Sequence, residues 1–169
     1  MIVLGVDPGT HITGWGLVGL VAGQRPAHIA HGVVRTRAED PLWVRLAAIH
    51  DALVVVLEQH HPNVLALEQC FVNKNIQSAL KLGHARGAVM VAAHRFGLDV
   101  FEYGPTQVKS AVAGSGRADK HQVAEMVRLL LHLPTSASAD ASDALAIAIC
   151  HSHNGLARAL AREVVQVRR

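Results

Sequence analysis

The sequence predicts an α/β fold with a five-stranded mixed sheet and helices on both of its faces. Short apolar runs of strand length alternate with helical patterns, turn residues separate them, and there is no internal repeat or long linker. The first apolar run covers residues 2–7 and is typical of a strand that is buried on both faces. Pro8 and Gly9 then predict a tight turn.

The remaining elements are expected in the following order. Residues 13–20 and 27–36 are strand candidates that form a meander with the first strand. Pro41 begins a helix with apolar side chains at helical spacing, which runs to about His60 before Pro62 stops it. Beyond it we expect a strand at 63–68, a helix at 76–95, a strand at 98–103, and helices at 105–113, 119–132 and 139–153.

Length and composition indicate one domain with a full hydrophobic core. The chain has 169 residues, half of them apolar, and its uncharged apolar stretches are too short for a membrane span. The N-terminus has no basic leader, so no signal peptide is expected. Cys70 and Cys150 match no disulfide framework or zinc pattern, which indicates reduced thiols in a cytoplasmic protein without membrane association. We expect one folded domain at 1–157 and a basic tail at 158–169.

The charge balance is mildly basic, with 16 Lys and Arg against 13 Asp and Glu. This balance is compatible with a nucleic-acid partner but does not prove one. The positions of the basic residues are more informative than their number, because two groups flank predicted acidic positions. These groups are Lys74, Lys81 and Arg86, and then Lys109, Arg117 and Lys120.

Four carboxylates stand beside apolar runs, at Asp7, Glu68, Asp140 and Asp143. Asp7 and Glu68 end predicted strands, so they share the carboxyl edge of the sheet if these strands are parallel neighbours. Asp140 and Asp143 share one face of a helix N-terminus. Four clustered carboxylates repel one another unless a hard divalent cation such as Mg²⁺ or Mn²⁺ lies among them. Two such ions would activate a water and stabilise the leaving oxygen in phosphodiester cleavage.

Ordinary structural explanations compete with this hypothesis. Asp7 could be a turn residue and Asp140 a helix cap, although Glu68 has no capping role at the end of an apolar strand. Phe71, three residues later, could belong to the core. His11 is near Asp7 in sequence, but a histidine in a loop is usually a bystander.

The predicted helix at 76–95 contains an unusual number of small residues, including Gly83 and Gly87. Glycine inside a helix costs about 1 kcal/mol relative to alanine, so a packing reason is expected. The helix could lie close to the protein's own sheet. Alternatively, it could pack against a second copy of the chain across a two-fold axis.

Five segments in fixed order carry a family resemblance. They are Gly5-Val-Asp-Pro-Gly-Thr10 with Thr13-Gly14, Glu68-Gln-Cys-Phe71, Asn75 through Ser78-Ala-Leu-Lys-Leu-Gly-His-Ala-Arg-Gly87, Phe101-Glu-Tyr103 with Gln107-Val-Lys109, and Ala139-Asp-Ala-Ser-Asp-Ala-Leu-Ala-Ile-Ala-Ile149. Over essentially its whole length, the chain resembles the RuvC family of bacterial Holliday-junction endonucleases.

The resemblance implies a ribonuclease-H-like fold and a homodimer that acts in DNA recombination and repair. It implies Mg²⁺- or Mn²⁺-dependent paired cleavage of a four-way DNA junction, with two ions per active site, and cooperation with a branch-migration motor of the RuvA and RuvB type. Asp7, Glu68, Asp140 and Asp143 fall on the family's metal-binding acids, although some members have histidine at the position of Asp140.

The resemblance also implies roles for residues near the acids. Lys109 and Lys120 match family lysines near the scissile strand, where a cation could offset transition-state charge. Phe71 matches an aromatic residue that stacks on a base at the junction centre. Further contacts with the DNA backbone are expected from Lys74, Asn75, Lys81, Arg86 and Arg117.

Three other functions compete with a junction nuclease. The turn from Asp7 to Gly14 is similar to the phosphate-binding turn of actin-like ATPases, but Asp140 and Asp143 fit that class poorly. A non-catalytic junction-binding protein of the same fold is a second alternative, which the presence of all four acids disfavours. A ribonuclease-H-like RNA-processing nuclease is a third, but those chains are typically shorter.

Overall fold

The computed structural model describes residues 1–21, 23–69 and 76–167, with side chains of the final helix described through His153. Within these residues, five strands form one mixed sheet in the order β3-β2-β1-β4-β5. The strands are β1 (Ile2–Asp7), β2 (Ile12–Gly19), β3 (Ala27–Arg35), β4 (Val64–Glu68) and β5 (Asp99–Tyr103). The first three pair antiparallel as the predicted meander, whereas β4 is parallel to β1 and to β5.

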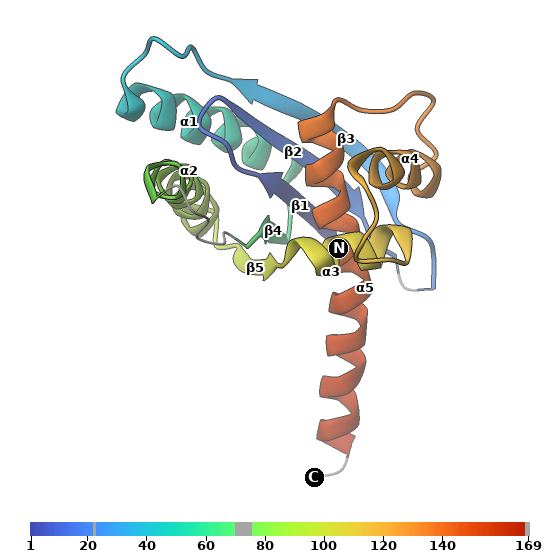
Figure 1. Cartoon of the computed structure of the whole chain (residues 1–169). Coiled ribbons are helices and arrows are strands. Elements are labelled where there is room, and N and C mark those ends of the chain that lie inside the picture. The colour runs from blue at the N-terminus through green and yellow to red at the C-terminus, as the bar shows by residue number, and fades with distance from the viewer. Residues whose placement is uncertain (22, 70–75, 168–169) are drawn as a thin grey trace.

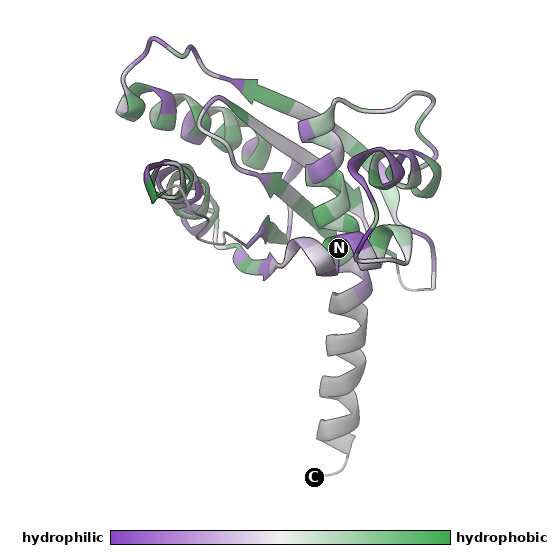
Figure 2. Ribbon diagram, in the orientation of Figure 1, coloured by the Kyte–Doolittle hydropathy of each residue, from purple (hydrophilic) through white to green (hydrophobic). Residues whose placement is uncertain are grey.

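Helices cover both faces of the sheet, as predicted (Figure 1). One face packs against α1 (Leu42–His60) and α2 (Ile76–Arg95), and the other against α3 (Pro105–Ala113), α4 (Lys120–Leu130) and α5 (Ala139–Val167). Alternate residues of β1 supply the two cores, because Val3 faces the α5 layer and Leu4 faces the α1 layer. Figure 2 shows hydrophobic segments along the sheet, whereas the helices carry hydrophobic and hydrophilic residues side by side.

Glycines let α5 approach the sheet unusually closely. A Cβ atom on Gly5 of β1 would lie 2.1 Å from the carbonyl oxygen of Ala144, and one on Gly14 of β2 would lie 2.0 Å from that of Asp140. No residue with a side chain fits at either position without movement of the backbone. This contact fixes the first turns of α5 at the carboxyl end of β1.

Two expectations about helices need correction. The last helix was expected to end at residue 153 but continues to Val167, across the expected domain boundary at 157. A Cβ atom on Gly83 or Gly87 would have no neighbour within 4 Å, so the explanation that α2 approaches its own sheet at these glycines is wrong. The division into 1–157 and 158–169 stays a prediction.

Among the helices that the structure describes, none is both long enough and apolar enough to span a bilayer.

The glycine contacts predict opposite outcomes for two alanine substitutions. Gly5→Ala should lower the free energy of unfolding by about 2 kcal/mol or more, because its Cβ overlaps the α5 backbone. Gly83→Ala should raise it by up to about 1 kcal/mol in the monomer, because only helix propensity changes. Urea unfolding at low protein concentration measures both. Equal effects of the two substitutions would contradict this account of α5.

Candidate active site

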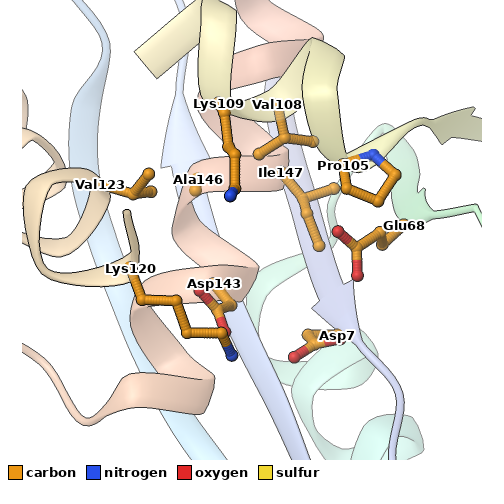
Figure 3. A pocket seen from close by; sticks show the side chains of 10 residues that line it. All are labelled: Asp7, Glu68, Pro105, Val108, Lys109, Lys120, Val123, Asp143, Ala146 and Ile147. Atoms are coloured by element: carbon orange, nitrogen blue, oxygen red, sulfur yellow. The ribbon is translucent and has the colours of Figure 1, made fainter. Parts of the chain in front are cut away.

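Asp7 and Glu68 lie side by side at the carboxyl edge of the sheet. They end β1 and β4, which are parallel neighbours with Val6 opposite Leu67. Asp143 comes from the second turn of α5, which is held over β1 by the glycine contact. Figure 3 shows these three carboxylates around one cavity, which has a volume of about 340 Å³. The predicted convergence of strand ends and helix start is therefore confirmed for three of the four acids.

Residues of α3, α4 and α5 complete the walls of this cavity. Lys109 extends from α3 and Lys120 from the start of α4, so both predicted lysines lie with the acids (Figure 3). The other lining residues are apolar, and they are Pro105, Val108, Val123, Ala146 and Ile147. The cavity therefore combines a charged side with an apolar side.

Asp140 is placed differently from the other three acids. It does not line the cavity, and its backbone packs against Gly14 of β2. Its negative charge nevertheless contributes to raising the pKa of Asp7. Asp140 thus belongs to the electrostatic environment of the site, while the cavity wall is formed by Asp7, Glu68 and Asp143.

The carboxylates of Asp7 and Glu68 ionise with difficulty. Burial, followed by the charges of Glu68, Asp143 and Asp140, raises the pKa of Asp7 from 3.8 to about 7, with Lys120 opposing the shift. Burial and the charge of Asp143 also raise the pKa of Glu68, and Lys120, Arg86 and Lys109 oppose this. The repulsion shows that two lysines do not compensate the negative charge of the cluster.

Lys120 is the cation nearest to the carboxylates. Its ammonium nitrogen lies 3.4 Å from Oδ2 of Asp143, and this ion pair raises the pKa of Lys120. In the described part of the chain, no three His, Cys, Asp or Glu side chains already surround a common point as a finished metal site. The chemistry of the donors nevertheless fits a hard divalent cation, since all of them are carboxylate oxygens and they repel one another.

Arg86 has a structural position instead of the exposed one expected of a DNA contact. Its side chain is buried in α2, and its guanidinium donates hydrogen bonds to the Glu68 carbonyl oxygen and to the Glu102 carboxylate. A phosphate could reach this guanidinium only if its hydrogen bonds within the fold were broken. Instead of the predicted contact with DNA, Arg86 stabilises the carboxyl end of β4.

The other expected DNA contacts are distributed around the site. Lys81 is exposed on α2, and Arg117 is exposed in the loop between α3 and α4, beside a second cavity of about 370 Å³. Phe71, Lys74 and Asn75 lie outside the described residues, so their predicted roles stay predictions.

Sequence reasoning missed Arg45 of α1, which is buried and donates hydrogen bonds to the carbonyl oxygen of Thr10. A signal was present, because Arg45 lies three residues after Leu42 and four before Ile49, on the apolar face of a predicted helix. A charged residue at such a position needs a buried partner.

The sheet order and the acids on adjacent parallel strand ends define a nuclease of the ribonuclease-H-like class. A family model described as Crossover junction endodeoxyribonuclease RuvC matches residues 3–151. The chain belongs to this family.

Individual relatives agree with the family assignment. The chain is 52% identical to the crossover junction endodeoxyribonuclease RuvC of Syntrophotalea carbinolica, over 90% of this chain and 94% of the relative. It is 52% identical to that of Rhodospirillum rubrum, over 96% and 97%. A structure of T. thermophilus RuvC in complex with Holliday junction substrate superimposes with a TM-score of 0.86 at 38% identity, covering 92% of this chain and 94% of that chain.

The raised pKa of Asp7 predicts that Asp7→Asn stabilises the metal-free protein at high pH. Because the folded pKa is about 7 and the unfolded pKa 3.8, wild-type stability falls as pH rises through this interval and stays low above it. At pH 8 the variant should gain on the order of 2 kcal/mol, or several degrees in Tm. Near pH 4 this gain should vanish.

Thermal unfolding in EDTA from pH 4 to pH 8 measures this difference. Asp99→Asn is the control, because Asp99 is exposed at the start of β5, away from the cluster. A stability difference between wild type and Asp7→Asn that does not change with pH would contradict the proposed repulsion.

Proposed function

We propose that this protein resolves four-way DNA junctions by metal-dependent, paired phosphodiester cleavage. The observation that carries the proposal is the single cavity lined by Asp7, Glu68 and Asp143, where burial and mutual repulsion raise the pKa of Asp7 to about 7. Family membership and the similar T. thermophilus enzyme, whose structure contains a Holliday junction substrate, support this choice of DNA substrate. Both favour a nuclease over the actin-like nucleotide-binding alternative and over a non-catalytic junction binder.

The metal would be Mg²⁺ or Mn²⁺, with two ions per site. Asp7, Glu68 and Asp143 would supply the ligands, and Asp140 would act at longer range or bind after a local adjustment. When bound, the ions supply the positive charge that activates water and stabilises the leaving oxygen in phosphodiester hydrolysis. The RuvC family is metal-dependent in general, and the all-oxygen donor set supports hard cations over Zn²⁺.

The two lysines of the cavity act on the DNA strand that is cut. Lys109 and Lys120 would contact oxygens of the scissile phosphate and offset the charge that develops there. Lys120 must leave the Asp143 carboxylate as cations and phosphate enter, since an ammonium and a metal ion compete for the same oxygen. Its exposed position at the start of α4 leaves room for this movement.

Contacts beyond the cavity would orient the junction. Lys81 and Arg117 are exposed and would contact phosphates. Phe71 would stack on an unpaired base, and Lys74 and Asn75 would add contacts with the DNA backbone. Arg86 is not included, because its guanidinium is held within the fold.

A homodimer would supply two active sites for the paired cuts. The exposed face of α2 supports this, since Ile76, Leu80 and Val91 are each more than half exposed. Gly83 and Gly87 of the same helix have open space around them, which another helix could occupy closely. A branch-migration motor of the RuvA and RuvB type would deliver the junction, and a chromosomal substrate implies a cytoplasmic location. The catalytic domain would end near residue 157.

Cleavage of a synthetic four-way junction tests the site. With Mg²⁺ or Mn²⁺, the wild type should cut two opposed strands symmetrically, and Asp7→Asn should be slower by about 100-fold or more, which is about 3 kcal/mol. Asp140→Asn should have a smaller effect, because Asp140 does not line the cavity. Both variants should still bind the junction in EDTA, which controls for misfolding. Normal cleavage by Asp7→Asn would refute the proposed metal site.

Sedimentation velocity tests the dimer. Leu80→Arg should shift the protein from dimer to monomer at micromolar concentration, because it places a charge in the apolar face of α2. Leu129→Arg is the matched control, since Leu129 is also about half exposed but lies on α4. A wild type that is monomeric under these conditions, or a Leu80→Arg variant that remains dimeric, would argue against this interface.

A further inference from the structure

The turn that follows Asp7 is held by an unusual buried arginine. The carbonyl oxygen of Thr10 accepts hydrogen bonds from Nε and Nη2 of Arg45, at 2.9 and 2.5 Å, and from the Thr36 hydroxyl at 2.6 Å. Arg45 is only 7% exposed, and no described carboxylate forms an ion pair with it. Burying a guanidinium is costly, so its use to hold one peptide carbonyl calls for an explanation.

The neighbouring carbonyls of this turn are also held from inside the protein. The buried hydroxyl of Thr13 donates to the Gly9 carbonyl at 2.8 Å and lies 3.3 Å from the Gly9 nitrogen. The Thr36 backbone nitrogen donates to the His11 carbonyl at 3.0 Å. Three successive carbonyl groups, of Gly9, Thr10 and His11, therefore have defined partners, and the orientation of the turn is fixed.

Fixing the carbonyls also fixes the peptide N–H groups. In a trans peptide the N–H points opposite to the C=O of the preceding residue, and the described chain has no cis peptide. The Thr10 carbonyl points toward Arg45 in the α1 layer, so the His11 N–H points toward the opposite side of the sheet. The Thr10 N–H likewise points away from Thr13. Neither N–H has a protein acceptor among the described residues.

The opposite side of the sheet is the side of the carboxylates. Gly5 of β1 contacts α5, and strand residues alternate, so Asp7 faces the α5 layer too. The free N–H groups of Thr10 and His11 thus face the same side of the sheet as Asp7, which lines the cavity. The donor strength of the His11 N–H is increased, because the Thr10 carbonyl of the same peptide accepts hydrogen bonds from a cation.

We propose that this turn anchors a phosphate of the DNA strand that enters the acid site. The N–H groups of Thr10 and His11 donate to a non-bridging phosphate oxygen, and successive backbone N–H groups of this kind form an anion-binding concavity. Arg45 and Thr36 are positioning residues, since they act through the Thr10 carbonyl and touch no DNA. This inference rests on the proposed junction nuclease and adds a strand-positioning contact to it.

Such a contact would hold DNA near the acid cluster in spite of the repulsion between phosphates and carboxylates. DNA approaching the carboxylate cluster, whose charge Lys120 offsets only in part, is repelled until cations enter. A side-chain cation near the acids would pair with them, as Lys120 does. A backbone donor cannot be captured by a carboxylate in this way, because its direction is fixed by the fold. The charge of Arg45 acts from behind the peptide, out of reach of the acids.

The affinity for a four-way junction tests the anchor. In EDTA at one fixed salt concentration, Arg45→Lys and Thr36→Val should bind a synthetic junction several-fold more weakly than the wild type, because the two N–H donors lose their fixed orientation. The slope of log K against log salt should stay that of the wild type, since a peptide N–H carries no charge. Arg45→Lys keeps the charge but loses the two hydrogen bonds from Nε and Nη2. Thr36→Ser keeps the hydroxyl and should restore the wild-type affinity.

A junction with single neutral methylphosphonate linkages locates the contact. One linkage near the cut should weaken wild-type binding and leave Arg45→Lys binding unaffected. Arg25→Lys is the matched control, since Arg25 is exposed at the opposite end of the sheet and its variant should behave as wild type. Melting curves of all variants show whether they are folded.

The possible outcomes separate this inference from the proposed function. If the wild type cleaves the junction but both positioning variants keep the wild-type affinity and methylphosphonate sensitivity, the anchor is refuted and the nuclease assignment stands. If the wild type neither binds nor cleaves the junction, the proposed function itself is refuted. Reduced stability without a change in methylphosphonate sensitivity would leave Arg45 a merely structural residue and also refute the anchor.

Discussion

The backbone contact between α5 and the central strands determines the rest of the site. Gly5 and Gly14 have no side chains to separate sheet from helix, so the start of α5 lies directly on the ends of β1 and β2. Asp143 thereby joins Asp7, although the two residues are 136 positions apart in the sequence. An alanine at either glycine would move the helix, and with it one carboxylate of the cluster. Packing of the core and construction of the active site are therefore the same constraint here.

The price of this arrangement is electrostatic. Burial and like charge raise the pKa of Asp7 to about 7, so the folded metal-free protein carries repulsion that the unfolded chain lacks. Lys120 relieves part of it through Asp143, but at 83% side-chain exposure it is a weak and replaceable partner. A stronger internal partner would stabilise the fold and compete with divalent cations. The weak pairing with Lys120 leaves most of the negative charge of the carboxylate cluster uncompensated.

Sequence patterns predicted most of the fold, because short apolar runs and Pro or Gly breakers mark each strand. They also predicted that Asp7 and Glu68 meet, since parallel strands place their carboxyl ends together. They could not separate Asp140 from Asp143, because helical spacing does not say which acid faces the cavity. Arg86 was misjudged because a basic residue beside acids in sequence resembles a DNA contact until its burial is known. The sequence left open whether the glycines of α2 face the protein's own sheet or a second chain, and only the open space around Gly83 and Gly87 decides against the sheet.

Two buried arginines stabilise the acidic edge of the sheet in the same way. Arg86 donates to the carbonyl of Glu68, and Arg45 donates to the carbonyl of Thr10, three residues after Asp7. Both arise from the helices on the face opposite to the cavity, so each stabilises a strand end from behind. Direct ion pairs with the carboxylates of the cavity would have fixed them more simply but would have occupied their oxygens. By binding the backbone instead, the arginines hold the edge in place, add positive charge nearby, and leave the carboxylate oxygens available for cations.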